Sequence, residues 1–93
     1  MTIISCFTND NFKVLFYLFE IKGSDNYARI TQQEIADELG FSRATINKII
    51  KVLKEEKYII QDSLHIGRYL ITDKAIMVIN ALKNIERNER NEN

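Results

Sequence analysis

The segment Thr31–Ile50, TQQEIADELGFSRATINKII, places two short helical patterns on either side of one tight corner. Thr31 and Glu34 have the spacing of a capping box, in which each side chain satisfies a free backbone N–H at a helix start. Gly40 ends the first pattern, because glycine tolerates the left-handed backbone of a sharp turn. Ser42 is the expected N-cap of the second helix. Two helices joined this closely must cross at a steep angle, which restricts the folds open to the chain.

The side chains around this corner also have the sizes that such a crossing requires. Ala36 is small where the two helices approach each other. The apolar residues expected to fill the wedge between the helices are Ile35, Leu39, Ile46 and Ile49. These are the demands of a helix-turn-helix, in which the first helix braces the second.

The residues before the corner predict a helix and a short strand. A cap cluster at residues 8–10 precedes NFKVLFYLFEIKG, which is apolar on nearly every face. Its length and the stop at Gly23, with Lys22 in the last turn, favour a helix over a strand. Tyr27–Ile30 alternates weakly, so we expect a short strand there.

The residues after the corner predict a hairpin and a final helix. Tyr58–Asp62 and Arg68–Ile71 have the β-branched and aromatic content of two strands, with the turn near Leu64–Gly67. Thr72 and Asp73 then cap the last helix. We therefore expect a mainly α fold with a small β-hairpin (α+β), in the order helix, short strand, helix, helix, hairpin, helix. This is the order of a winged helix-turn-helix, formed here as a single domain over residues 1–93 with an N-terminal arm at 1–7 and a frayed polar tail at 87–93.

A family resemblance supports this interpretation. TQQEIADELGFSRATINKIIKVLKEEKYI resembles the helix-turn-helix of bacterial winged-helix transcription regulators. GRYLITDKA is similar to the wing strand and final-helix start of MarR-like and related small repressors, although Ala75 stands where many relatives place a glycine. The likeness covers about Tyr27 to Ala81 and implies sequence-specific binding of double-stranded DNA, as in a transcriptional repressor. Similar segments also occur in plasmid replication initiators.

The charge distribution points to the second helix of the motif as the DNA-contacting element. The chain has 13 basic and 13 acidic side chains and a formal net charge of zero. Between residues 42 and 54, however, there is no acidic residue, and the four basic residues are Arg43, Lys48, Lys51 and Lys54. Neutrality therefore conceals a basic face on this helix.

The DNA-binding candidates are the residues that helical spacing turns away from the apolar stripe, together with Thr45. They are Ser42, Arg43, Ala44, Thr45, Asn47, Lys48 and Lys51. Arg43 and Asn47, one turn apart, suit bidentate contacts to guanine and adenine. Lys48 and Lys51 suit phosphates, and Ser42 and Thr45 lie where free N–H groups also favour an anion.

Two further candidates lie outside this helix. Gln33, near the start of the preceding helix, has an amide that suits a phosphate. Arg68 in the hairpin suits the minor groove or a phosphate. The support for Arg68 is weak, because the hairpin is short and carries Asp62 instead of several basic residues.

The apolar pattern of the first and last helices predicts a homodimer. Ala75, Val78, Leu82 and Ile85 have the 3,4,3 spacing of a coiled-coil seam, and Ile76 and Ile79 widen it. Together with the Phe-rich first helix they offer more apolar surface than one small core should absorb. In a monomer the same stripes would pack on each other, so the monomer stays open as an alternative.

Other classes of function find little support. No Ser/His/Asp arrangement, metal-ligand cluster or phosphate-binding glycine loop is present, so we expect neither an enzyme nor a metal or cofactor site. Cys6 has no disulfide partner and is expected to be a small buried hydrophobe, and His65 a plain turn residue. No segment has the ~18 apolar residues of a membrane span, so a cytoplasmic location is expected. A winged-helix module for protein–protein contacts, or the DNA-binding domain of a plasmid or phage replication or excision factor, remains an alternative.

Overall fold

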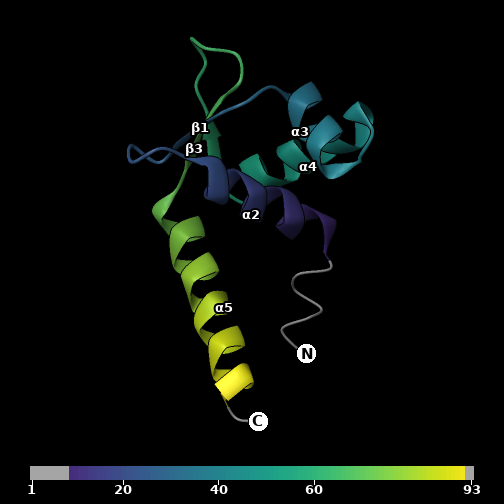
Figure 1. The fold of residues 1–93 in the computed structure, drawn as a ribbon. Coiled ribbons are helices and arrows are strands. Elements are labelled where there is room, and N and C mark those ends of the chain that lie inside the picture. The colour runs from purple at the N-terminus through teal and green to yellow at the C-terminus, as the bar shows by residue number, and fades with distance from the viewer. Residues whose placement is uncertain (1–8, 92–93) are drawn as a thin grey trace.

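A computed structural model describes residues 9–91 of the chain, so the predictions for Cys6 and for an arm at residues 1–7 lie outside the described residues. The described part contains four helices and three strands (Figure 1). In chain order they are α2 (Asp10–Ile21), β1 (Tyr27–Arg29), α3 (Gln32–Leu39), α4 (Arg43–Glu55), β2 (Ile59–Gln61), β3 (Arg68–Ile71) and α5 (Asp73–Asn91). The predicted element order of a winged helix-turn-helix is confirmed.

Helix α2 begins as predicted and ends slightly earlier. The Asn9 side chain accepts a hydrogen bond from the Phe12 N–H at 3.3 Å and caps the helix. The helix ends at Ile21, because Lys22 already has an extended backbone with ψ of 150°. Gly23 is therefore not the helix stop that the sequence predicted. It belongs to the following turn instead, where its N–H donates to the Tyr27 carbonyl at 3.0 Å.

The three strands form one antiparallel sheet in the order β1-β3-β2. Leu70 of β3 lies opposite Tyr27 of β1 on one side and opposite Ile60 of β2 on the other. The predicted hairpin is present, with β2 shorter at both ends than Tyr58–Asp62. We call this hairpin, residues 59–71, the wing. Strand β1 fixes the wing to the body, since it connects α2 to α3 and pairs with β3.

The core lies where α2, α3 and α4 meet beneath the sheet. Val14, Leu15 and Leu18 of α2 are buried, as are Ile59, Tyr69 and Ile71 of the wing. The corner residues also belong to this core as predicted: Ile35, Ala36, Ile46 and Ile49 are at most 5% exposed, and Leu39 packs against them partly buried. Burial of this apolar stripe fixes the rotation of α4 about its own axis.

Helix α5 is only partly absorbed by the core and projects away from the rest of the fold (Figure 1). Ala75 and Ile79 are fully buried, whereas Met77 is 72% and Ile85 47% exposed. The helix continues to Asn91 and so includes the first five residues of the predicted polar tail at 87–93. Glutamate and arginine are good helix formers, and an intrahelical hydrogen-bond ladder needs no apolar side chain. No helix within residues 9–91 has the length and apolarity to cross a membrane.

Candidate nucleic-acid interface

The corner between α3 and α4 is held by hydrogen bonds among neighbouring residues. The Glu34 N–H donates to Thr31 Oγ1 at 3.1 Å, and the Thr31 N–H donates to Glu34 Oε1 at 3.0 Å, which completes the capping box. The hydrogen bond from the Thr31 N–H to the carboxylate is the main reason that the pKa of Glu34 is lowered, and the Thr31 side chain lowers it further. Gly40 adopts a φ of +75° and its N–H donates to the Ala36 carbonyl at 2.9 Å. The chain therefore reverses at Gly40 without the strain that another residue would meet there.

The start of α4 is fixed by Ser42. Its Oγ accepts the Thr45 N–H at 3.1 Å and donates to Thr45 Oγ1 at 2.9 Å. The two hydroxyl groups are thus partners of each other, and Thr45 is half-buried. The cap leaves the other N–H groups of the first turn without a helical partner, a position that favours an anion.

One face of α4 is apolar and buried, and the other is polar and exposed. The buried face consists of Ile46, Ile49, Ile50 and Leu53. The exposed residues among the candidates are Ser42, Arg43, Ala44, Asn47, Lys48 and Lys51. Helical spacing alone predicted this division, because residues three and four apart share a face.

The basic side chains of α4 are not neutralised by carboxylates within the described part of the chain. No ion pair among residues 9–91 involves Arg43, Lys48 or Lys51. The Lys54 ammonium donates to Gln61 Oε1 at 3.0 Å, a neutral partner. Three cations along one exposed helix face can therefore meet anionic groups without first breaking an internal ion pair.

A groove of about 470 Å³ joins this face to α3 and to the wing. Its lining residues are Thr31, Gln32, Gln33, Arg43, Asn47, Gln61, Ile66, Gly67 and Tyr69. Gln33, Arg43 and Asn47 were predicted, and the structure brings them to this groove. The others were missed, since they reach it only through the placement of α3 and the wing. Gln33 is partly engaged, because its Nε2 donates to Asp37 Oδ1 at 2.9 Å.

The wing contains a polar network around Asp62. Asp62 Oδ2 lies 3.0 Å from His65 Nδ1 and 3.5 Å from Arg68 Nη1. The pKa of Asp62 is lowered, first by the hydrogen bond from the Leu64 N–H and then by His65 and Arg68. His65 is a turn residue as expected, but its side chain also contacts Asp62 within the wing. Arg68, predicted to contact DNA, is turned toward a carboxylate of its own hairpin.

The tip of the wing is apolar. Leu64 is 85% and Ile66 95% exposed, the two highest values among the exposed large hydrophobic residues of the described chain. Gly67, at the base of the tip, has a φ of +78°, and its carbonyl accepts the Ile30 N–H at 2.8 Å. This bond anchors the tip next to the start of α3. Of the wing tip, Ile66 is the large side chain that lines the groove.

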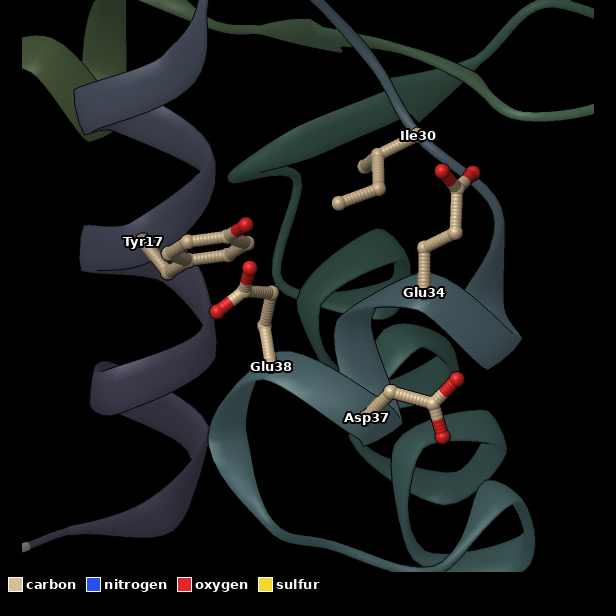
Figure 2. A pocket seen from close by; sticks show the side chains of 5 residues that line it. All are labelled: Tyr17, Ile30, Glu34, Asp37 and Glu38. Carbon is tan, nitrogen blue, oxygen red and sulfur yellow. The ribbon is translucent and has the colours of Figure 1, made fainter.

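An acidic hollow of about 370 Å³ lies between α2 and α3 (Figure 2). Tyr17 reaches from α2 toward Glu38, and Ile30, Glu34 and Asp37 complete the lining. Burial raises the pKa of Tyr17, and the charges of Glu38 and Glu34 raise it further. The hollow shares no lining residue with the groove beside α4. The two linings nevertheless meet on α3, where Gln33 of the groove donates to Asp37 of the hollow.

Helices α3 and α4, joined by a tight turn at Gly40, form a helix-turn-helix, and the exposed face of α4 is basic. Together with the wing they define a winged helix-turn-helix domain. Residues 12–60 match the family described as winged helix-turn-helix DNA-binding. This match spans more than half of the sequence, and the chain belongs to that family. Neither a search of curated proteins nor a search of solved structures gave a significant match. Within residues 9–91 no group of three or more His, Cys, Asp or Glu side chains is placed to hold a metal ion.

Proposed function

We propose that the protein is a small transcriptional repressor of MarR-like type, which binds a specific double-stranded DNA site through α4. One observation carries the proposal: Arg43, Lys48 and Lys51 lie on the exposed face of a helix whose opposite face is held in the core. A helix held in this way fits the major groove, where every base pair presents a distinct pattern of donors and acceptors.

Each candidate residue on α4 and at its N-cap has a role suited to its chemistry. Arg43 and Asn47 face the groove together and read base edges. Lys48 and Lys51 neutralise phosphates and fix the register of the helix. Ala44 is small enough for close approach to a base, and a thymine methyl group is its natural contact. Ser42 and Thr45 lie beside the free N–H groups at the helix start, which favour a phosphate.

Gln33 and Arg68 contribute at the edge of this interface. Gln33 lies in the groove with Arg43 and Asn47, so its amide reaches a phosphate beside the bases they read. Arg68 contacts DNA only if its guanidinium leaves Asp62. We therefore rank Arg68 as the weakest of the proposed contacts.

The protein acts as a homodimer in this proposal, with α5 as the main contact. Ala75 and Ile79 are buried in the core of the domain and are therefore removed from the predicted seam. The remaining strip is exposed or half-buried and comprises Met77, Val78, Ala81, Leu82 and Ile85. A second copy of α5 would cover it and relate two α4 helices by a two-fold axis. The two helices would then lie about 34 Å apart, one turn of DNA, or a multiple of this distance. A cytoplasmic location follows from the same proposal.

Selection of bound sequences from a random pool of double-stranded DNA tests this function. We expect enrichment of a palindromic site, and a steep fall of affinity with rising salt as counterions are released from neutralised phosphates. Absence of any enriched sequence would contradict the proposal. An enriched site without two-fold symmetry would retain specific binding but remove the homodimer.

A protein-interaction module is the second candidate, and the exposed Leu64 and Ile66 at the wing tip favour it. Contiguous apolar surface on a soluble domain is often a protein contact. Salt-insensitive or absent DNA binding, together with capture of a protein partner that Ile66→Ser abolishes, would support this candidate over the repressor.

A further inference from the structure

We infer that Gln32 is a positioning residue for Asn47, holding its amide in the orientation that reads adenine. The inference rests on the proposed function of α4 as the base-reading helix. Gln32 is the first residue of α3, directly after the Thr31 cap, and is half-buried. It carries no charge and was not among the residues that the sequence singled out.

The contact joins two elements that meet only in the folded chain. Asn47 Nδ2 donates to Gln32 Oε1 at 3.2 Å, across 15 positions in the sequence. Both residues line the groove together with Arg43. The backbone of Gln32 is fixed by the adjacent capping box of Thr31 and Glu34. Gln32 Oε1 is therefore held by a well-fixed backbone where it accepts a hydrogen bond from the exposed Asn47 side chain.

The chemistry of the asparagine amide gives this bond its consequence. Nδ2 carries two N–H groups, of which Gln32 accepts one and leaves one. The remaining N–H and the Oδ1 acceptor match the N7 acceptor and 6-amino donor that adenine presents in the major groove. A turned amide would direct Oδ1 at Gln32 and present two donors, which match the N7 and O6 acceptors of guanine instead.

A turned Asn47 amide would keep this hydrogen bond only if the Gln32 amide turned as well, so the bond opposes turning of Asn47 alone. In the structure Gln32 accepts and Asn47 donates. A glutamate at position 32 can only accept while ionised, so Gln32→Glu allows the observed arrangement alone. A methionine of similar length offers no comparable acceptor, so Gln32→Met leaves the Asn47 amide free to turn. The two variants therefore separate the hydrogen bond from the volume of the side chain.

The test compares affinities for two DNA duplexes that differ only at the base pair which Asn47 reads, one with adenine and one with guanine. That position is first located as the one whose preference Asn47→Ala removes. We expect Gln32→Met to reduce the adenine-to-guanine affinity ratio by about two- to tenfold, because loss of one hydrogen bond lets the Asn47 amide turn to the arrangement that matches guanine. Gln32→Glu should keep or raise the ratio. Its extra negative charge weakens binding to both duplexes and cancels in the ratio.

The outcomes distinguish this inference from the function on which it rests. An unchanged ratio for Gln32→Met, with the ratio lost in Asn47→Ala, would overturn the role of Gln32 and leave the base-reading role of α4 intact. Equal loss of the ratio in Gln32→Met and Gln32→Glu would assign Gln32 a merely structural role, and thermal unfolding of both variants would show it. If Asn47→Ala changes no base preference, the base-reading role of Asn47 fails together with the inference.

Discussion

Helix α4 carries several exposed basic side chains and the wing carries Arg68, but the two elements differ in what these side chains already contact. Arg43, Lys48 and Lys51 on α4 form no ion pair within residues 9–91. Arg68 in the wing lies 3.5 Å from the Asp62 carboxylate and is 33% exposed. A phosphate meets the α4 cations directly, whereas it must compete with Asp62 for Arg68. Local pairing, more than the count of cations, therefore decides which element dominates DNA binding.

The largest effect is expected from Arg43→Ala. If Arg43 reads a guanine, its loss should reduce discrimination at that one base pair by about 1–3 kcal/mol. Competition binding between the selected site and its single-base variants measures this change. Lys13→Ala on α2 removes the same charge elsewhere and should leave the discrimination unchanged. If Arg43→Ala and Lys13→Ala changed base discrimination equally, the proposal that α4 reads the bases would fail.

Ser42→Ala should lower the free energy of unfolding by about 1 kcal/mol, because the Thr45 N–H loses its capping partner. Urea unfolding followed by circular dichroism measures the loss. The matched control is Ser63→Ala in the exposed turn of the wing, which should change stability very little. A silent Ser42→Ala would mean that the start of α4 is not held by its cap.

Lys51→Ala should weaken binding to all sequences alike. Loss of one phosphate contact reduces the slope of log affinity against log salt by about 1, with base preference unchanged. Titrations of specific and unrelated duplexes over a range of salt concentrations check both parts. A change of base preference in this variant would place Lys51 on a base instead of a phosphate.

The smallest effect is expected in the wing, from Asp62→Asn. Release of Arg68 should strengthen DNA binding by a few-fold at most, since exposed ion pairs are weak. The effect of Arg68→Ala should then be larger in the Asp62→Asn background than in the wild type, as a double-mutant cycle would show. Weaker binding by Asp62→Asn would indicate that the network instead holds the wing in its DNA-binding shape.

The pH at which the effect of Asp62→Asn on DNA binding is lost follows from the lowered pKa of Asp62. A carboxyl whose folded pKa is depressed contributes its stabilisation above the ordinary aspartate pKa and loses it as the pH falls through the folded value. The contribution of the Asp62 carboxylate to this effect should therefore be lost only in acid.

The sequence predicted those features that depend on residues close together in the chain. The capping box of Thr31 and Glu34, the turn at Gly40 and the N-cap Ser42 are local signals, because a cap or a turn is formed within four residues. The exposed face of α4 was also predictable, since helical periodicity places it on the opposite side of the helix from Ile46 and Ile49.

Features that depend on how distant elements meet could not be predicted. Nothing in the sequence shows that Gln32 bonds Asn47, or that Asp62 turns Arg68 inward. The burial of Ala75 in its own core, which shifts the proposed dimer strip, depends equally on where α5 packs. Side-chain pairs across elements are set by tertiary packing, for which spacing along the chain carries no signal.

Chemical-shift mapping of the full chain during titration with its selected DNA site tests the central claim most directly. The account predicts that the amide signals of residues 42–51 and the side-chain amides of Gln32 and Asn47 shift most. Signals around the acidic hollow at Tyr17 and Glu38 should remain in place. Shifts concentrated in α5 or in the acidic hollow, with α4 unchanged, would contradict the account.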